Sequence, residues 1–475
     1  RQMKYKDPNL SVQERVQDLL ARMTLEEKVA QCIQVGVEAH NRQEILARTR
    51  AHGMGSRIIA GSNLAGNESQ HLAEVEDLNE IQRAAVEESR LGIPLIFGLD
   101  VIHGQRTTFP IPLGMAATFD PELIESAYRI AAVEASRIGI HWSFAPMVDI
   151  ARDPRWGRIV EGYGEDPYLG GKMAAAAVRG FQGEKDKRGY FQKNHILACA
   201  KHYIGYGAAE GGRDYNTAEI SANTLRNIFL PPFKAAVHAG VGSVMSAFQD
   251  LNGEPASGSH YLLTEILKDE LGFAGFVISD WASVQQLIDH RVAADEREAA
   301  RIAFGAGLDM EMATDCYAHH LAKLVTEGVI PMERIDDAVR RVLSAKFALR
   351  LFEHPYADPE KALDTDFPAE HQAVTRQMAA EGMVLLKNDG LLPLSKEVKR
   401  VAVIGPYANQ RRTLLGTWVN DSLVNEVPTL LEAVQRALPD VQVLSTPTGL
   451  YDEMIMLAAE ADVVILALGE SNARN

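Results

Sequence analysis

Short apolar segments recur along the first 312 residues, and helix-length amphipathic patterns separate them. A buried parallel strand is apolar on both faces, so each of these segments has the composition expected of one. The alternation of strand and helix predicts a parallel sheet. We predict eight strands, at 31–37, 56–60, 93–99, 142–147, 196–203, 242–248, 276–281 and 308–312.

Helix-start signals support the segments between these strands. Asp120 and Asp166 each stand before a proline, where Asp can cap a helix and proline can take its first position. Thr24 and Glu27 have the spacing of a capping box. Eight strand–helix repeats predict a (β/α)8-type barrel or a variant of it. An open doubly wound sheet is the alternative, although its glycine-rich phosphate turn is missing after the first strand.

The pattern changes after the barrel. An amphipathic helix at 333–352 closes the first predicted domain, residues 1–352, and the charged, proline-containing segment 353–370 reads as a linker. Residues 371–475 predict an α/β sandwich domain, which we expect to be incomplete because the chain stops just past an apparently buried strand. Its predicted helices are 371–386, 430–438 and 451–460, and its strands are 400–406, 441–444 and 462–468.

Composition narrows the function classes. Of 475 residues, 46% are hydrophobic and 24% charged, as in globular proteins, and the net charge is −16. That charge argues against nucleic acid and anionic membranes as partners and suits a small neutral substrate. No apolar stretch is long enough to span a bilayer, and no signal-peptide core follows Arg1, although a signal could have been removed. A homodimer is left open.

The three cysteines, Cys32, Cys199 and Cys316, lie far apart in apolar or mixed contexts. Their spacing fits neither a metal site nor a disulfide framework, so we expect buried free thiols. No metal-ligand spacing and no phosphate loop is visible elsewhere, so no cofactor is predicted.

Five consecutive predicted strands end in, or are followed closely by, polar or aromatic side chains. In a β/α barrel these strand ends meet at one face, which is where such folds keep their chemistry. Carboxylates and cations together can hydrogen-bond the hydroxyls of a sugar, and a carboxylate aimed at the anomeric carbon can form a glycosyl–enzyme intermediate. The candidates are Asp100, Asp149, Arg155 or Arg158, Lys201, His202, Met245, Phe248, Asp280 and Trp281.

Each candidate also has a structural reading. Asp280 could cap the next helix, and Arg158 could form an ion pair with Glu161 or its neighbours. Lys201 could pair with a buried carboxylate, and Met245 could fill the core. For any single residue the structural explanation is about as good as the functional one. It explains poorly why five successive strands all end in such residues.

Several motifs together resemble glycoside hydrolase family 3, and most of all its bacterial periplasmic β-glucosidases. The resemblance covers nearly the whole chain and rests on the combination rather than on one motif. The motifs are Gly98-Leu99-Asp100-Val101-Ile102-His103-Gly104, Arg152-Asp153-Pro154-Arg155-Trp156-Gly157-Arg158, Gly164-Glu165-Asp166-Pro167, Lys201-His202-Tyr203, Met245-Ser246-Ala247-Phe248 and Ser279-Asp280-Trp281.

The resemblance implies a retaining, exo-acting β-glucosidase that releases terminal glucose from β-glucosides or short β-gluco-oligosaccharides, in the periplasm or outside the cell. It implies Asp280 as the nucleophile. Asp100 is typical of members that accept glucose, because it can reach the C4 and C6 hydroxyls. The implied substrate-binding residues are Asp100, Arg158, Lys201, His202, Met245 and Trp281.

The general acid/base is the point of departure. Family glucosidases take this glutamate from a loop of the second domain after a strand such as 462–468. Glu470 stands right at that strand end, so it is a weak candidate, and we expect the working glutamate beyond Asn475. Trp418 could reach the leaving-group side of the site or pack in a core.

Other functions stay open. Within the fold these are a β-xylosidase or a glycoside phosphorylase. Lys201 at a barrel strand end could instead form a Schiff base, as in an aldolase. A chain without its acid/base could also be a non-catalytic sugar-binding protein.

Overall fold

All eight predicted barrel strands are present in the computed structural model, which describes residues 2–36, 41–59 and 70–472. Residues 37 and 60, the last of two predicted strands, lie outside the described residues. The strands are shorter than predicted, because each apolar segment also includes loop residues. They are β1 (Ile33–Val35), β2 (Ser56–Ile59), β3 (Ile96–Leu99), β4 (Trp142–Ser143), β5 (Cys199–Tyr203), β6 (Ser243–Ser246), β9 (Phe276–Ile278) and β10 (Glu311–Met312).

The barrel strands form two parallel sheets, in the orders β10-β1-β2-β3-β4 and β5-β6-β9. Isolated parallel bridges join their edges, from Trp142 to Leu197, from Met147 to Lys201 and from Ile278 to Met310. The strands therefore follow one another around a ring with two seams, a variant of the (β/α)8 barrel rather than a continuously closed one. A short antiparallel hairpin, β7 (Asp250–Leu251) and β8 (Glu254–Pro255), was not predicted.

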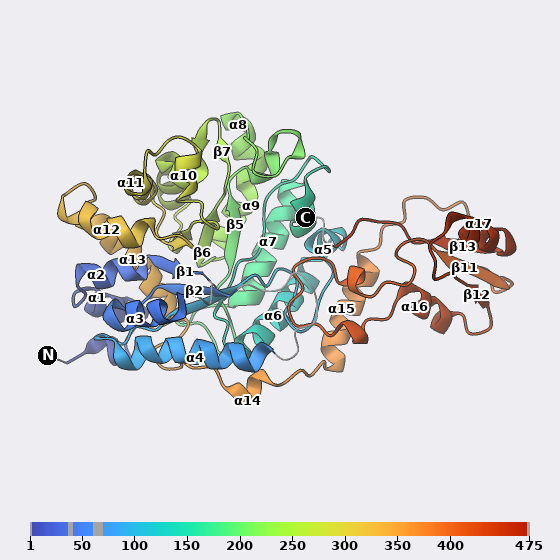
Figure 1. Cartoon of the computed structure of the whole chain (residues 1–475), viewed down its shortest axis with the longest axis horizontal. Coiled ribbons are helices and arrows are strands. Elements are labelled where there is room, and N and C mark those ends of the chain that lie inside the picture. The colour runs from blue at the N-terminus through green and yellow to red at the C-terminus, as the bar shows by residue number, and fades with distance from the viewer. Residues whose placement is uncertain (1, 37–40, 60–69, 473–475) are drawn as a thin grey trace.

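Helices surround this ring (Figure 1). Asp120 and Asp166 cap the helices that follow them, and Thr24 with Glu27 forms the predicted capping box. Leu225–Phe229 and Tyr261–Glu270 are π-helical. The α-helices are α1 (Val12–Leu20), α2 (Leu25–Gln31), α3 (Arg42–His52), α4 (Gln70–Glu88), α5 (Pro112–Ala117), α6 (Pro121–Arg137), α7 (Pro167–Gln182), α8 (Ala222–Thr224), α9 (Leu230–His238), α10 (Gln286–Asp289), α11 (Glu296–Ala306), α12 (Cys316–Thr326) and α13 (Met332–Ala348).

Aromatic rings fill the interior of the ring. Trp142 lies edge-on to Phe144 and Phe276, with centroid distances of 4.8 and 5.1 Å. A Cβ on Gly98 of β3 would lie 2.4 Å from Phe144, so the ring fits only because that position has no side chain. The three cysteines are buried free thiols, as predicted.

A second α/β unit follows α14 (Pro359–Ala362), a short helix inside the predicted linker. Its parallel sheet has the order β12-β11-β13, and in Figure 1 it lies to one side of the barrel. Within the described residues, no helix is long and apolar enough to cross a membrane. The elements are α15 (Ala369–Glu381), β11 (Arg400–Ile404), α16 (Leu430–Ala437), β12 (Gln442–Leu444), α17 (Tyr451–Glu460) and β13 (Val463–Leu466).

Two expectations for this unit were wrong. The helix predicted at 371–386 ends at Glu381, with Gly382 as its C-cap, and Leu386 beyond it is 91% exposed. The strand predicted to be buried at 462–468 is buried on one side at most, because Val463 and Ile465 pack into the unit's apolar cluster while Leu466 is exposed.

Residues 416–422, which we call the docking loop, bind the second unit to the barrel. Asn420 Nδ2 donates to the carbonyl oxygen of Asp100 at 3.1 Å, and Ser422 Oγ donates to that of Arg106 at 2.9 Å. Met378 of α15 is buried within the barrel's apolar core. The end of the barrel that carries Asp100 is therefore in contact with the second unit.

Candidate active site

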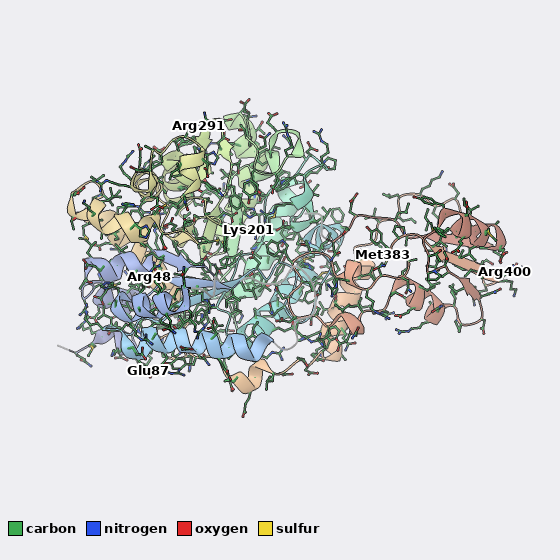
Figure 2. All side chains as sticks on the ribbon, in the orientation of Figure 1. Arg48, Glu87, Lys201, Arg291, Met383 and Arg400 are labelled. Atoms are coloured by element: carbon green, nitrogen blue, oxygen red, sulfur yellow. The ribbon has the colours of Figure 1, made fainter. Side chains whose placement is uncertain are left out.

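The ends of the barrel strands surround a cavity of about 310 Å³. Strands β2, β3, β5, β6, β9 and β10 or the residues just after them all contribute side chains. Figure 2 places Lys201 among the central strands, away from Met383 and Arg400 of the second unit. The lining residues are Ile58, Asp100, Phe144, Arg158, Lys201, His202, Asp214, Tyr215, Met245, Phe248, Asp280, Trp281, Met312 and Trp418.

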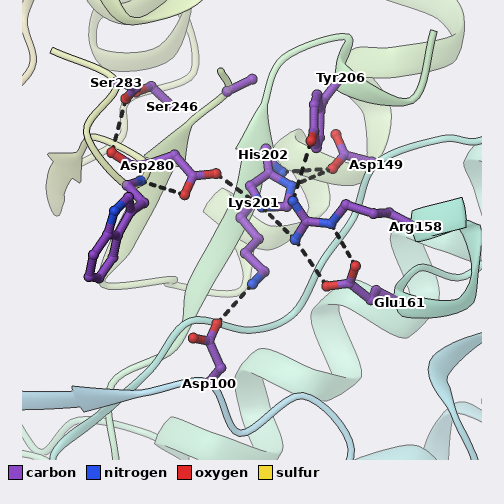
Figure 3. A network of polar contacts seen from close by, with 12 residues as sticks. Asp100, Asp149, Arg158, Glu161, Lys201, His202, Tyr206, Ser246, Asp280 and Ser283 are labelled. Carbon is purple, nitrogen blue, oxygen red and sulfur yellow. Dashed lines mark hydrogen bonds and ion pairs between the residues drawn. The ribbon is translucent and has the colours of Figure 1, made fainter. Parts of the chain in front are cut away.

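Asp280 follows β9 and is 7% exposed. Figure 3 shows its side chain pointing toward Lys201 and His202. Its Oδ1 accepts a hydrogen bond from the backbone N–H of Trp281 at 2.6 Å, whereas the buried Oδ2 accepts none from the residues that the structure describes. Burial raises the pKa of Asp280 to about 7, although the positive charges of Arg158 and Lys201 oppose that shift. One carboxylate oxygen is thus held and the other is uncommitted.

His202 lies beside this carboxylate, with Nε2 3.4 Å from Asp280 Oδ2. Its Nδ1 is 2.8 Å from Asp149 Oδ2, and its backbone N–H donates to the same oxygen at 3.0 Å. Burial, with the nearby cations Arg158 and Lys201, lowers the pKa of His202 well below 6.5, so the ring is neutral. A proton on Nδ1, donated to Asp149, leaves Nε2 as an acceptor facing Arg158 Nη2 at 3.4 Å.

Arg158 is held on both sides (Figure 3). Glu161 accepts two hydrogen bonds from its guanidinium, Nε to Oε2 at 2.6 Å and Nη2 to Oε1 at 3.0 Å. Its carbon Cζ lies 5.4 Å from the centre of the Tyr206 ring. Glu161 is 1% exposed, and the charge of Arg158 lowers its pKa against the effect of burial. Arg158 therefore forms the ion pair with Glu161 that the structural reading predicted, and it also lines the cavity, while its contact with a sugar stays a prediction.

Lys201 and Asp100 form a second charged pair across the cavity. The distance from Lys201 Nζ to Asp100 Oδ1 is 3.1 Å, and the lysine side chain is 3% exposed. Lys201 Nζ also lies 5.4 Å from the centre of the Trp418 ring. The two cations and two carboxylates give the cavity hydrogen-bonding groups that suit a polyhydroxylated ligand.

Aromatic side chains form the walls. The Tyr215 and Phe248 rings lie 4.4 Å apart, and Trp281 is 43% exposed. Trp418 comes from the docking loop, and its indole Nε1 donates to Glu161 Oε1 at 2.7 Å. Apolar walls with a few polar groups are typical of small-molecule sites.

The structure brings the predicted nucleophile and all the predicted substrate-binding residues to this cavity. Glu470 of the second unit is exposed and does not line it. Arg155 also lies apart, paired with Asp153 and 71% exposed. Sequence reasoning missed Asp214, whose Oδ1 accepts hydrogen bonds from Trp156 and Tyr206. The aromatic residues around it gave the only signal that could have found it.

Two other features of the described residues lie outside this site. Residues 136–141, 190–195 and 349–361 contribute to a larger cavity of about 660 Å³, which contains none of the predicted site residues. Glu296, His319 and His320 bring possible ligand atoms within 4.8 Å of one another on α11 and α12. Neither contributes a residue to the cavity around Asp280.

Both units match models of one family. Residues 24–345 match the Glycosyl hydrolase family 3 N terminal domain, and residues 383–475 match the Glycosyl hydrolase family 3 C-terminal domain. The chain is 37% identical to a periplasmic beta-glucosidase of Salmonella typhimurium, over 96% of this chain and 62% of that protein. It is 34% identical to a putative beta-xylosidase of Formosa agariphila, over 98% of this chain and 63% of that protein.

Solved structures of a Listeria innocua beta-glucosidase have the same fold. The complex with glucose is 38% identical with a TM-score of 0.85, and a mutant in complex with laminaribiose is 37% identical with a TM-score of 0.87. Each match covers 97% of this chain and 64% of the other. The chain thus spans less than two thirds of the length of these relatives.

Proposed function

The chain belongs to glycosyl hydrolase family 3, and on that premise we propose that it is part of a retaining, exo-acting β-glucosidase. It would release terminal glucose from β-glucosides or short β-gluco-oligosaccharides. The observation that carries the proposal is Asp280, whose Oδ2 is uncommitted at the floor of a sugar-sized cavity. The relatives named beta-glucosidase, and the one solved with glucose, support the choice of sugar.

The chemistry assigned to Asp280 is nucleophilic. Its ionised Oδ2 attacks the anomeric carbon, the bond to the leaving-group oxygen breaks, and that oxygen takes a proton from a general acid. Water then attacks the same carbon, loses a proton to the general base and frees the carboxylate. The N–H of Trp281 holds Oδ1 and so fixes the direction of Oδ2.

The charged pairs hold the sugar. Asp100 and Lys201 can share its hydroxyls from one side, while Arg158 and His202 present donors and an acceptor from the other. Arg158 and Lys201 also favour the ionised form of Asp280, which the reaction requires. Met245 and Trp281 supply apolar contacts to the ring.

The general acid/base stays a prediction, placed beyond Asn475 with Glu470 as the weaker choice. We also propose that the protein acts in the periplasm or outside the cell, for which the support is the name of the Salmonella relative. A β-xylosidase is the second candidate, because relatives with that name match over nearly all of this chain. Asp100 at the cavity favours glucose through its reach to the C6 hydroxyl that xylose lacks.

The test combines substrates with a covalent trap. 4-Nitrophenyl β-glucoside, β-xyloside and N-acetyl-β-glucosaminide are compared on this chain and on a longer form of the protein. We expect the glucoside to be preferred, and a 2-deoxy-2-fluoro-glucoside to label Asp280 with one sugar per chain. Activity only in the longer form would support an acid/base beyond Asn475, and equal activity would favour Glu470.

Other results would overturn the proposal. Preference for the xyloside would make the protein a xylosidase, and phosphate-dependent turnover would make it a phosphorylase. Borohydride trapping of a carbonyl substrate on Lys201 would indicate an aldolase. Glucose binding without turnover in the longer form would indicate a sugar-binding protein.

A further inference from the structure

Trp418 connects the docking loop to the charged groups of the site. Its indole N–H donates to Glu161 Oε1 at 2.7 Å, and the same carboxylate holds Arg158 through two hydrogen bonds. Glu161 is 1% exposed, so water does not compensate for a lost donor. A residue of the second unit thereby helps to set the position of a barrel cation.

The docking loop adopts a costly backbone conformation to place this indole. Trp418 has a φ of +54°, in the left-handed region that bulky residues rarely adopt. Gly416 has a φ of +78°, and a Cβ there would lie 2.6 Å from Ile111 of the barrel. Strained residues persist where the surroundings hold them and often mark functional positions. Here the surroundings include the hydrogen bond from Asn420 to the carbonyl of Asp100.

We propose that Trp418 is a positioning residue, whose indole N–H fixes Glu161 and through it holds Arg158 at the sugar. The site is then fully assembled only while the second unit is docked on the barrel. This inference rests on the proposed function for its kinetic readout. The face of the indole is a separate contact, since Lys201 Nζ lies over it at 5.4 Å.

Trp418→Phe in the full-length protein separates the two contacts, because phenylalanine keeps an aromatic face for Lys201 and removes the N–H donor. We expect kcat/KM for 4-nitrophenyl β-glucoside to fall by about 10–100-fold, the range for a hydrogen bond to a buried charge. The fall should come mainly from kcat. The acidic limb of the pH profile should also move to higher pH, since a displaced Arg158 no longer favours ionised Asp280.

Two further variants test whether Trp418 affects activity through Arg158. Combining Trp418→Phe with Arg158→Ala should be no worse than Arg158→Ala alone, because the indole acts through the guanidinium. Ser422→Ala removes a docking hydrogen bond without touching Glu161, and it should leave kcat/KM within about twofold. A purely structural role of Trp418 would instead give additive losses and an unmoved pH profile.

The outcomes distinguish this inference from the proposed function. If Trp418→Phe has normal kinetics, or if Ser422→Ala reproduces its losses, the inference fails while the glucosidase proposal stands. If the wild type does not hydrolyse glucosides, the proposed function fails, and glucose binding by calorimetry becomes the readout. In that case, unchanged glucose affinity in Trp418→Phe overturns the inference and a loss of about tenfold or more supports it.

Discussion

Two carboxylates stand just beyond parallel strands of this chain, Asp280 after β9 and Glu470 after β13, and their surroundings differ. Asp280 is buried between two cations and a neutral imidazole, whereas Glu470 is exposed beyond a strand whose Leu466 is 55% exposed. The carboxylate at the end of β9 therefore owes its burial and its charged neighbours to the other strands whose ends meet at the same place. Glu470, also a carboxylate, instead follows β13 at the edge of a three-stranded sheet.

The strongest way to break this comparison is to remove each carboxylate in turn. Asp280→Ala should lower kcat for a glucoside by about 10⁴-fold or more, because no other group can form the covalent bond. Glu470→Ala should retain kcat within about threefold, as expected of an exposed side chain. Near-normal turnover of the Asp280 variant, with far-UV circular dichroism confirming its fold, would contradict the role given to it.

Arg158→Ala should have the next largest effect. We expect kcat/KM to fall by about 10²–10³-fold, as when one donor to a transition-state charge is removed. Arg155→Ala is the matched control, because that arginine lies three residues away, pairs with Asp153 and is 71% exposed. Equal losses in the two variants would mean that proximity in sequence, rather than the cavity, explains the effect of Arg158.

Asp100→Ala sharpens the choice of sugar. Its loss should lower kcat/KM for the glucoside by about 10–100-fold and for the xyloside by less, because xylose has no C6 hydroxyl to lose contact with. The measurement is the ratio of the two values in wild type and variant. An unchanged ratio would show that Asp100 does not read this part of the sugar.

The last prediction concerns stability rather than activity. The pKa of Asp280 is about 7 in the folded chain, above the usual value for unfolded aspartate, so the folded state binds the extra proton between about pH 4 and pH 7. Wild-type stability therefore falls as pH rises through that window. Asp280→Asn does not titrate and should be the more stable protein at pH 8, by up to about 4 kcal/mol at 1.36 kcal/mol per pKa unit.

Urea unfolding of both proteins at pH 5 and pH 8 measures this difference. Glu470→Gln serves as the exposed control and should show no such pH dependence. If the free energy of unfolding of the wild type instead rises relative to that of Asp280→Asn between pH 5 and pH 8, the neighbours of the carboxylate stabilise its charged form more than burial destabilises it.

Much of the barrel follows from local sequence. The eight apolar segments and the caps Asp120 and Asp166 depend on neighbours within a few residues, and all of them are present. The exposure of Leu466 was not predictable in this way, because an apolar run reads the same whether one or both faces are covered. The end of α15 at Glu381 was signalled by Gly382, a residue type that often ends helices.

Only the site residues at or near the ends of barrel strands could be predicted from the sequence. Asp100 follows directly on β3, Lys201 and His202 lie near the end of β5, and Asp280 comes two residues after β9. Barrel geometry alone therefore places them together. Trp418 is more than 250 residues from Glu161 and lies on a loop of another unit, and no periodicity reports such a contact. The prediction therefore left its role open.

The shared carboxylate of Glu161 has a consequence for protein engineering. In a chimera that joins this barrel to the second unit of a different relative, Glu161 still needs an indole N–H donor at the position of Trp418. Second units that lack a tryptophan at this position should give hybrids that fold but have a low kcat, even when every barrel residue that lines the cavity is retained. In a library of such hybrids, activity should therefore depend on the residue that the second unit places at position 418. Substitutions at Arg158, Glu161 and Trp418 should be tolerated together more often than singly.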